Sequence, residues 1–273
     1  MSSRPINSCP PKRAEGQREL CVIDAYALND GFRRVILGGA ELETLTVDRS
    51  IIGPHLKLII PPKDAACLLW PEFDPKLGRL IWPEGERPTV RTYSLRHYDK
   101  ENQRLTIDLV SHEGGVASDW ARCAKAGDKI GIWGPGGRIA YRGQWTLFVA
   151  DRSALPAVAY SLEEVLPRDA KGKAVIEVAD ESEIMALNSP KGIEVVWLIR
   201  RDGDESALID AAASTAFPAG AEPLVWGGME CSLAKALRRS LIDKGELARD
   251  QIYLVNYWRE GVPEGGFSHT GED

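Results

Sequence analysis

The stretch GPGGRIAYRGQWTLFVADRSALPAV, residues 134–158, separates two different sequence patterns. It runs from a glycine-rich turn into the continuous apolar segment Trp145–Ala150, and then into apolar residues at helical spacing. Before it, short strand-forming runs are bounded by Gly, Pro, Asp or Asn. After it, strand and helix patterns alternate. We therefore place a domain boundary near Arg142.

The pattern before this boundary is typical of an antiparallel β barrel, because several short strands follow one another without long helical segments. One short helical pattern, Val116–Ala124, interrupts them. We assign residues 18–142 to this domain. Its strands are expected at Cys21–Ala27, Arg33–Leu37, Leu56–Ile60, Val90–His97, Leu105–Val110 and Lys129–Trp133.

The pattern after the boundary predicts an α/β domain over residues 143–261, in which a parallel sheet is covered on both faces. Residues 1–17, rich in Pro, Ser and charge, are expected to be disordered, and the Gly-rich acidic tail 262–273 to be mobile. Beyond Trp145–Ala150, strands are expected at Lys173–Ala179, Ile193–Ile199, Pro223–Trp226 and Ile252–Tyr257, and helices at Ser153–Leu166, Ser206–Ala213 and Glu230–Lys244.

Charge and composition exclude several classes of protein. The net charge of −6 argues against a general nucleic-acid binder. Residues 1–142 hold 21 basic and 18 acidic residues, and residues 143–273 hold 13 and 22, so the halves differ in sign. No apolar run is long enough to cross a bilayer and no secretory signal begins the sequence, so we expect no membrane insertion and a cytoplasmic location. The five cysteines and four histidines form no metal-binding motif, so redox chemistry would require an organic cofactor.

The segment RTYSLR, residues 91–96, carries an unusual set of side chains on an expected barrel strand. Strand alternation puts Arg91, Tyr93 and Leu95 on one face, and Thr92, Ser94 and Arg96 on the other. Such a strand suits a large planar anionic ligand, since an aromatic ring can stack on it and a guanidinium can pair with a phosphate. The alternative is a solvent-facing strand with two surface arginines.

A second candidate site is the segment GGVASDW, residues 114–120. Small residues that open a helix leave its first N–H groups accessible to an anion. Ser118 or Asp119 acting only as a helix cap is the alternative. Together with the 91–96 strand, this helix start suits a flavin dinucleotide.

The combination of RTYSLRHYD, LTIDLVSHEGGVASDWA, GDKIGIWGPGG and DRSALPAV resembles the siderophore-interacting proteins, which are flavin-dependent ferric-siderophore reductases of the ferredoxin reductase superfamily. The resemblance extends from about Arg33 to Gly261. It implies a six-stranded flavin barrel followed by an α/β domain of the nicotinamide-binding type. FAD is then the expected cofactor.

The resemblance also implies the residues that contact FAD. Arg91 is expected at the phosphates, and Tyr93 and Ser94 at the isoalloxazine. His112 precedes the glycine turn, and a structural role for its imidazole is the alternative. An aromatic residue near the chain end, assigned here to Trp258, is expected to cover the flavin or the cleft, with ordinary packing as the alternative. The pyrophosphate is expected at Gly115, Val116, Ala117 and Ser118.

Three basic residues are assigned to an anionic ferric siderophore, namely Lys57, Arg138 and Arg259. Lys57 and Arg259 lie in segments that resemble the family, and Arg138 is expected to add to the same basic pocket. A cation near the flavin would attract a catecholate or hydroxamate shell. The alternative for Lys57 is a lysine on an edge strand. No metal site of the protein's own is predicted.

Residues at the ends of the second domain's strands are assigned to NADPH or NADH: Asp151, Ser153, Arg200, Arg201 and Glu230. Ligands of parallel sheets sit at this carboxyl edge, where a guanidinium pair suits a 2′-phosphate. Solvated arginines and a helix-capping Glu230 are the alternatives. Arg152-Ser153 and Gly227-Gly228-Met229-Glu230 depart from the family pattern.

The sequence thus predicts a monomeric FAD-dependent reductase that passes electrons from NAD(P)H to ferric siderophores. One alternative is a reductase that receives electrons from ferredoxin. Others are a flavin-carrying siderophore-binding module with little turnover, and a flavin reductase with a different acceptor.

Overall fold

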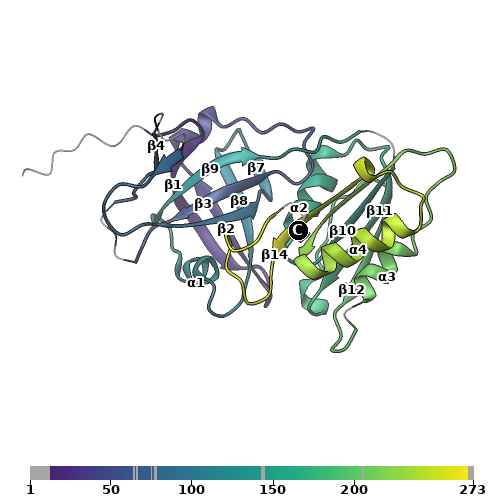
Figure 1. The fold of residues 1–273 in the computed structure, drawn as a ribbon. Coiled ribbons are helices and arrows are strands. Elements are labelled where there is room, and N and C mark those ends of the chain that lie inside the picture. Colours follow the sequence, from purple (N-terminus) through teal and green to yellow (C-terminus); the bar gives the residue numbers. More distant parts are fainter. Residues whose placement is uncertain are drawn as a thin grey trace, which may run out of the picture.

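The computed structural model describes residues 13–63, 65, 67–74, 76, 79–142, 145–204 and 206–269. Most of the segment expected to be disordered, residues 1–12, lies outside this range, as do residues 270–273 of the expected mobile tail. The described residues form an antiparallel barrel and a parallel α/β unit side by side (Figure 1). Both parts of the predicted fold class are confirmed.

The first domain is one antiparallel sheet in the order β6-β3-β9-β1-β2-β8-β7. A separate hairpin of two short strands, β4 and β5, was not predicted. The barrel strands and the hairpin are β1 Gln17–Ala27, β2 Phe32–Gly38, β3 His55–Ile60, β4 Glu72–Asp74, β5 Arg79–Ile81, β6 Thr89–Ser94, β7 His97–Asp99, β8 Arg104–Val110 and β9 Lys129–Gly136; a short 3-10 helix spans Ala40–Thr44.

The sheet closes because its two end strands are almost continuous in the chain. Sequence analysis predicts one strand over 90–97, but the chain changes neighbour at residues 95 and 96. The last pair of β6 with β3 is Ser94 with His55, whereas β7 begins by pairing His97 with Thr106 of β8. Only Leu95 and Arg96 separate β6 from β7, so the sheet curves back on itself. Apolar side chains, including the fully buried Leu95, fill the barrel.

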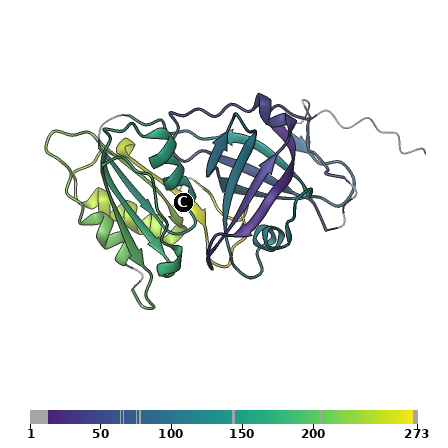
Figure 2. The same ribbon diagram turned by 180° about the vertical axis from the view of Figure 1, so that it is seen from behind.

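Helix α1, Val116–Cys123, follows β8 and packs its small residues Ala117 and Ala121 against the barrel core. Figure 2 shows α1 at one end of the barrel strands, away from the second domain. The helix expected from the short 116–124 pattern is therefore present.

The second domain is a five-stranded parallel sheet in the order β12-β11-β10-β13-β14. The helix expected over 153–166 is shorter, because α2 gives way to a wider π-helical turn at Ser161–Val165. The other elements agree with the predicted alternation. They are β10 Trp145–Ala150, α2 Leu155–Tyr160, β11 Lys171–Val178, β12 Gly192–Ile199, α3 Ala207–Ala213, β13 Pro223–Glu230, α4 Cys231–Asp243 and β14 Ile252–Trp258, with 3-10 turns at Glu181–Glu183 and Arg249–Gln251.

Helices cover both faces of this sheet, which explains why its central strand is continuously apolar. Alternate residues of β10 enter different layers: Phe148 packs on the α2 side and Val149 on the side of α3 and α4. Among the described residues, no helix combines the length and apolar character that spanning a membrane requires.

Candidate functional site

A cavity of about 240 Å³ lies between the two domains. Its walls come from β3, β6 and the segment after β9 on the barrel side, and from β13 and β14 on the other side. The tail contributes His269. The cavity therefore combines three parts of the chain that are far apart in sequence.

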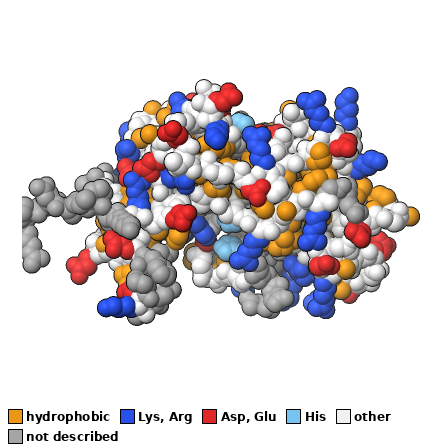
Figure 3. Space-filling model, turned by 90° about the horizontal axis from the view of Figure 1, so that it is seen from above, with side chains coloured by type: hydrophobic (Ala, Val, Ile, Leu, Met, Phe, Trp, Pro, Cys, Tyr) orange, Lys and Arg blue, Asp and Glu red, His pale blue; other side chains and the backbone are white. Residues whose placement is uncertain are grey.

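The barrel side of this cavity is basic. Lys57 and Arg138, two of the three predicted substrate residues, both line it, together with His55 and His269. Burial lowers the pKa of His55, and the positive charges of Lys57, His269 and Arg138 lower it further. Histidine side chains lie among Lys and Arg side chains near the junction of the domains (Figure 3). The cavity thus suits an anionic guest.

Strand β6 presents different side chains to the cavity and to the barrel core, as the predicted alternation requires. Thr92 and Ser94 line the cavity, whereas Tyr93 packs against the barrel core. The Ser94 hydroxyl lies 3.2 Å from the phenol oxygen of Tyr257 on β14. Strand β6 of the barrel and strand β14 of the second domain therefore meet at this point.

Arg91 and Tyr93, assigned to FAD, are both half-buried on β6. Arg91 donates from Nη1 to the carbonyl of its neighbour Val90, and its other guanidinium donors have no hydrogen-bond partner among the described residues. Burial raises the pKa of Tyr93 to about 12, with the negative charge of Glu264 adding to the effect. The phenol is therefore neutral at any physiological pH.

The start of α1 is open in the way that a pyrophosphate site requires. The residue before the helix, Gly115, is extended, and no side chain caps the first turn. The side chain of Val116 is 45% exposed. A second cavity, of about 410 Å³, lies beside this turn and is lined partly by Arg33 and Arg122.

His112 and Ser118 shape this turn. The backbone N–H of His112 donates to the Ser118 hydroxyl at 3.0 Å. A β-carbon on Gly115 would lie 2.1 Å from the His112 ring, so any other residue there would require this exposed ring to move. A flavin dinucleotide fits this arrangement for three reasons. The start of α1 is accessible, Arg91 has guanidinium donors without a partner among the described residues, and β6 lies beside a basic cavity.

Four residues assigned by sequence meet at the carboxyl edge of the second sheet. The buried Asp151 carboxylate accepts hydrogen bonds from the Ser153 and Glu230 N–H groups at 2.8 and 2.9 Å, and from Trp258 Nε1 at 2.8 Å. Burial raises the pKa of Asp151. Trp258 therefore lies beside Asp151, while its neighbour Tyr257 is the aromatic residue that reaches Ser94.

The Glu230 side chain and the predicted arginines of the second domain do not line the interdomain cavity. The Glu230 carboxylate caps α4 by accepting from the N–H groups of Ser232 and Leu233, as the alternative interpretation expects. Arg200 Nε lies 3.5 Å from Glu177 at the end of the neighbouring strand, and Arg201 is exposed. Arg259 is exposed and is not among the residues that line the interdomain cavity.

Sequence reasoning missed Glu264, which lies in the tail expected to be mobile. Its carboxylate lies 3.1 Å from Lys57 Nζ and accepts hydrogen bonds from Thr92 N at 2.8 Å and Thr92 Oγ1 at 2.5 Å. His269 Nε2 lies 3.7 Å away. Lys57 and Thr92 are more than 170 residues from Glu264 in sequence, and His269 lies within the tail. No local sequence pattern therefore predicts the contact. The one available signal is an acidic residue in a short Gly-rich segment.

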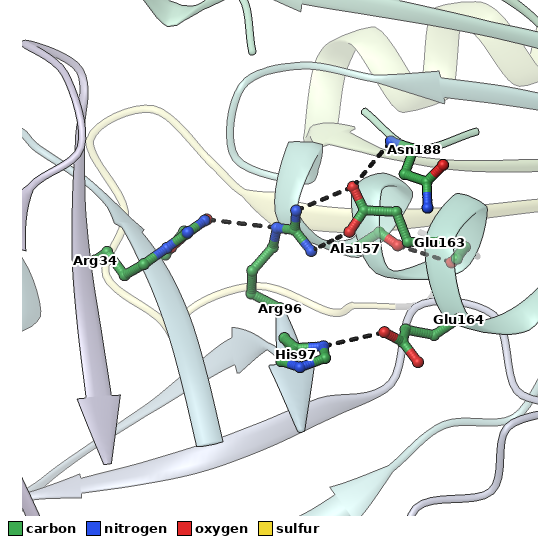
Figure 4. A network of polar contacts seen from close by, with 9 residues as sticks. Arg34, Arg96, His97, Ala157, Glu163, Glu164 and Asn188 are labelled. Atoms are coloured by element: carbon green, nitrogen blue, oxygen red, sulfur yellow. Dashed lines mark hydrogen bonds and ion pairs between the residues drawn. The ribbon is translucent and has the colours of Figure 1, made fainter. Parts of the chain in front are cut away.

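A network of ion pairs joins the domains close to the cavity (Figure 4). Arg96, in the bend between β6 and β7, makes two hydrogen bonds to Glu163 at 2.6 and 3.1 Å. His97 Nδ1 lies 3.0 Å from Glu164 in the same π turn. Within the described ranges, no group of His, Cys, Asp and Glu side chains forms a metal site.

Comparisons with known proteins identify relatives of this chain in sequence and in structure. The family model described as the siderophore-interacting FAD-binding domain matches residues 21–139, and the one described as siderophore-interacting protein matches residues 143–261. An NADPH-dependent ferric-chelate reductase of Escherichia coli is 34% identical over 93% of this chain and 99% of its own. The ferric vibriobactin reductase ViuB of Vibrio cholerae is 33% identical over 85% of each chain. The crystal structure of a siderophore utilization protein from T. fusca is 32% identical, with a TM-score of 0.75 over 93% of this chain and 95% of that one.

Proposed function

This chain belongs to the siderophore-interacting protein family, and from that membership we propose that it is an FAD-dependent reductase of ferric siderophores. We propose NADPH or NADH as the electron donor. The observation that carries the proposal is the basic cavity between the domains. Ser94 of the barrel and Tyr257 of the second domain both line this cavity and contact each other.

FAD, when bound, would accept two electrons as a hydride and pass them on one at a time. The chain's own residues position and enclose the reactants. Arg91 and the uncapped α1 would hold the phosphates, through a guanidinium and free N–H groups. The family resemblance assigns Tyr93 and Ser94 to the ring system; of the two, Ser94 lines the cavity, whereas Tyr93 packs against the barrel core.

Lys57 and Arg138 would hold the anionic shell of the ferric chelate in the cavity by charge attraction. Tyr257 and Trp226 would exclude water from the opposite wall. Iron reduction requires no nucleophile or general acid. The product Fe²⁺ is bound less tightly by hard oxygen ligands than Fe³⁺, so it leaves the chelate.

The nucleotide would bind at the carboxyl edge of the parallel sheet, as the fold favours. Arg200 and Arg201 at the end of β12 offer guanidinium groups for a phosphate there. Ferredoxin remains a second candidate donor because the turns at Asp151 and Glu230 differ from the family pattern. The net charge of −9 on residues 143–273 argues against docking an acidic ferredoxin on this domain. We further propose that the protein acts as a monomer in the cytoplasm.

The test is an assay with purified FAD-loaded protein, a ferric siderophore, a chelator that colours with Fe²⁺, and NADPH, NADH or reduced ferredoxin in separate reactions. We expect colour with at least one nicotinamide. Absence of colour with every donor, while the chelate still binds, would favour the siderophore-binding module. Rapid turnover of a quinone or free flavin without ferric reduction would instead indicate a different reductase.

The FAD assignment is tested by Arg91→Ala. Loss of the guanidinium should lower the FAD retained after purification severalfold, because a charge-assisted contact to phosphate is lost. The absorbance ratio of flavin to protein measures this. Arg87→Ala, which removes an exposed arginine of the same domain, is the matched control. Equal FAD content in Arg91→Ala and wild-type protein would refute the role of Arg91.

A further inference from the structure

The segment after β14 returns from the second domain to the barrel (Figure 1), and it brings a carboxylate to the basic wall of the cavity. The side chain of Glu264 is only 18% exposed. Its two oxygens contact Lys57, Thr92 and His269, all of which line the cavity. An anion of the chain itself thus occupies part of the surface that suits an anionic guest.

The contacts of Glu264 hold a carboxylate in its charged form. Burial alone would raise the pKa of Glu264, but the His269 imidazole 3.7 Å away, the hydrogen bonds from Thr92 and the charge of Lys57 outweigh it and lower the pKa to about 2. The Lys57 ammonium also donates to the Thr92 hydroxyl, so two of its three N–H donors are used within the chain. An anionic guest that pairs with Lys57 therefore competes with Glu264 for the charge of this lysine.

Two further features indicate that a guest can replace Glu264 at Lys57. The side chains of Lys57 and His269 are 39% and 38% exposed, so a guest in the cavity can reach both. The strap that carries Glu264, residues 262–269, is fastened to β14 through Asn256, whose N–H and side-chain amide donate to the carbonyls of His269 and Ser268. Glu264 can thus leave Lys57 while the strap stays attached to β14.

We propose that Glu264 is a specificity-determining residue that competes with the ferric chelate for Lys57 and so disfavours highly anionic chelates relative to neutral ones. The inference rests on the proposed function, because it assigns the cavity to a ferric chelate. Displaced Glu264 would also repel an anionic chelate that remains nearby, whereas a neutral chelate would meet no such repulsion.

The experiment compares wild-type protein with Glu264→Gln, which keeps the size and hydrogen-bonding capacity of the side chain but removes its charge. The probes are a trianionic ferric tris-catecholate and a neutral ferric tris-hydroxamate. Binding to the oxidised, FAD-loaded protein is followed by quenching of tryptophan fluorescence, and reduction by the Fe²⁺ chelator assay. Glu264→Gln should tighten binding of the catecholate by roughly three- to tenfold and change binding of the hydroxamate much less.

Two further variants identify the cause. Glu246→Gln removes the same charge from an exposed residue remote from the cavity and should leave both affinities unchanged. In a Lys57→Gln background, the gain from Glu264→Gln should largely disappear, because the two groups compete through that lysine. An equal ratio of the two affinities in wild type and Glu264→Gln would overturn the proposal.

The binding titration also separates this inference from the proposed function. If wild-type protein reduces neither chelate with any donor, the reductase assignment fails, but the titration still reports whether Glu264 discriminates between the chelates. If both chelates are reduced and Glu264→Gln changes neither affinity, only the inference fails.

Discussion

At the scale of single residues, the contact between His269 and Glu264 changes the titration of both groups. The Glu264 carboxylate, 3.7 Å from Nε2, raises the pKa of His269 against the opposing effect of burial. A histidine whose pKa is raised by folding stabilises the fold fully below its unfolded pKa. That contribution is lost as the pH rises through the folded pKa. The strap is therefore held most firmly in mildly acidic solution.

This contact predicts a shift that NMR can measure. In Glu264→Gln the pKa of His269 should fall, because the carboxylate that raises it is removed. A pH titration of imidazole C–H signals measures the midpoint, and a His269→Gln variant identifies the signal among the four histidines. A midpoint that Glu264→Gln leaves unchanged would show that the two side chains do not meet in solution.

At the scale of elements, Asp151 joins the ends of three parallel strands. It follows β10, accepts from the N–H of Glu230 at the end of β13, and accepts from the indole of Trp258 at the end of β14. Replacing this carboxylate by an amide turns one acceptor oxygen into a donor that faces other donors. Buried donors without acceptors cost free energy.

Asp151→Asn should therefore lower the free energy of unfolding by about 1–3 kcal/mol. Urea denaturation, followed by far-UV circular dichroism, measures the change. Asp250→Asn, at an exposed position of the same domain, should change it by less than about 0.5 kcal/mol. Equal values for the two variants would mean that Asp151 does not tie the strand ends together.

How far elements could be predicted depended on whether their cause is local. The bounds of β10 were predicted because five apolar residues and Thr146, in the six-residue run WTLFVA, fit a strand buried on both faces. The break between β6 and β7 was not predicted. It reflects a change of partner strand from β3 to β8, and no residue type in the sequence indicates such a change. Likewise, Lys57 was predicted by resemblance and Arg138 as a further cation of the same pocket, whereas the contact of Glu264 with Thr92 spans 172 residues and appears only in the fold.

At the scale of the whole molecule, a group of polar contacts contributes to the relative position of the domains. The side chains of Arg96 and Glu163 are 11% and 16% exposed, so their ion pair is largely shielded from solvent. Glu163 also accepts from the N–H of Asn188 at 3.3 Å. Near this pair, Gly53 donates to the Ser161 hydroxyl at 3.0 Å. Together these contacts join the barrel to the π turn after α2.

Glu163→Ala should lower the free energy of unfolding by roughly 2–4 kcal/mol, since it leaves a mostly buried guanidinium without its main partner. Guanidinium chloride denaturation measures the change, with exposed Glu246→Ala as the control. A loss no greater than that of the control would mean that the Arg96 contact contributes nothing to domain association.

The interdomain cavity has walls of separate origin. One wall includes β6, the barrel strand that carries the residues assigned to FAD. Much of the other wall comes from β14 and the strap, which lie within residues 252–269. Under the proposed function, substitutions within residues 252–269 would change which ferric chelate the cavity prefers without altering the barrel residues assigned to FAD. Replacing residues 252–269 by those of a homologue should therefore transfer the chelate preference of that homologue.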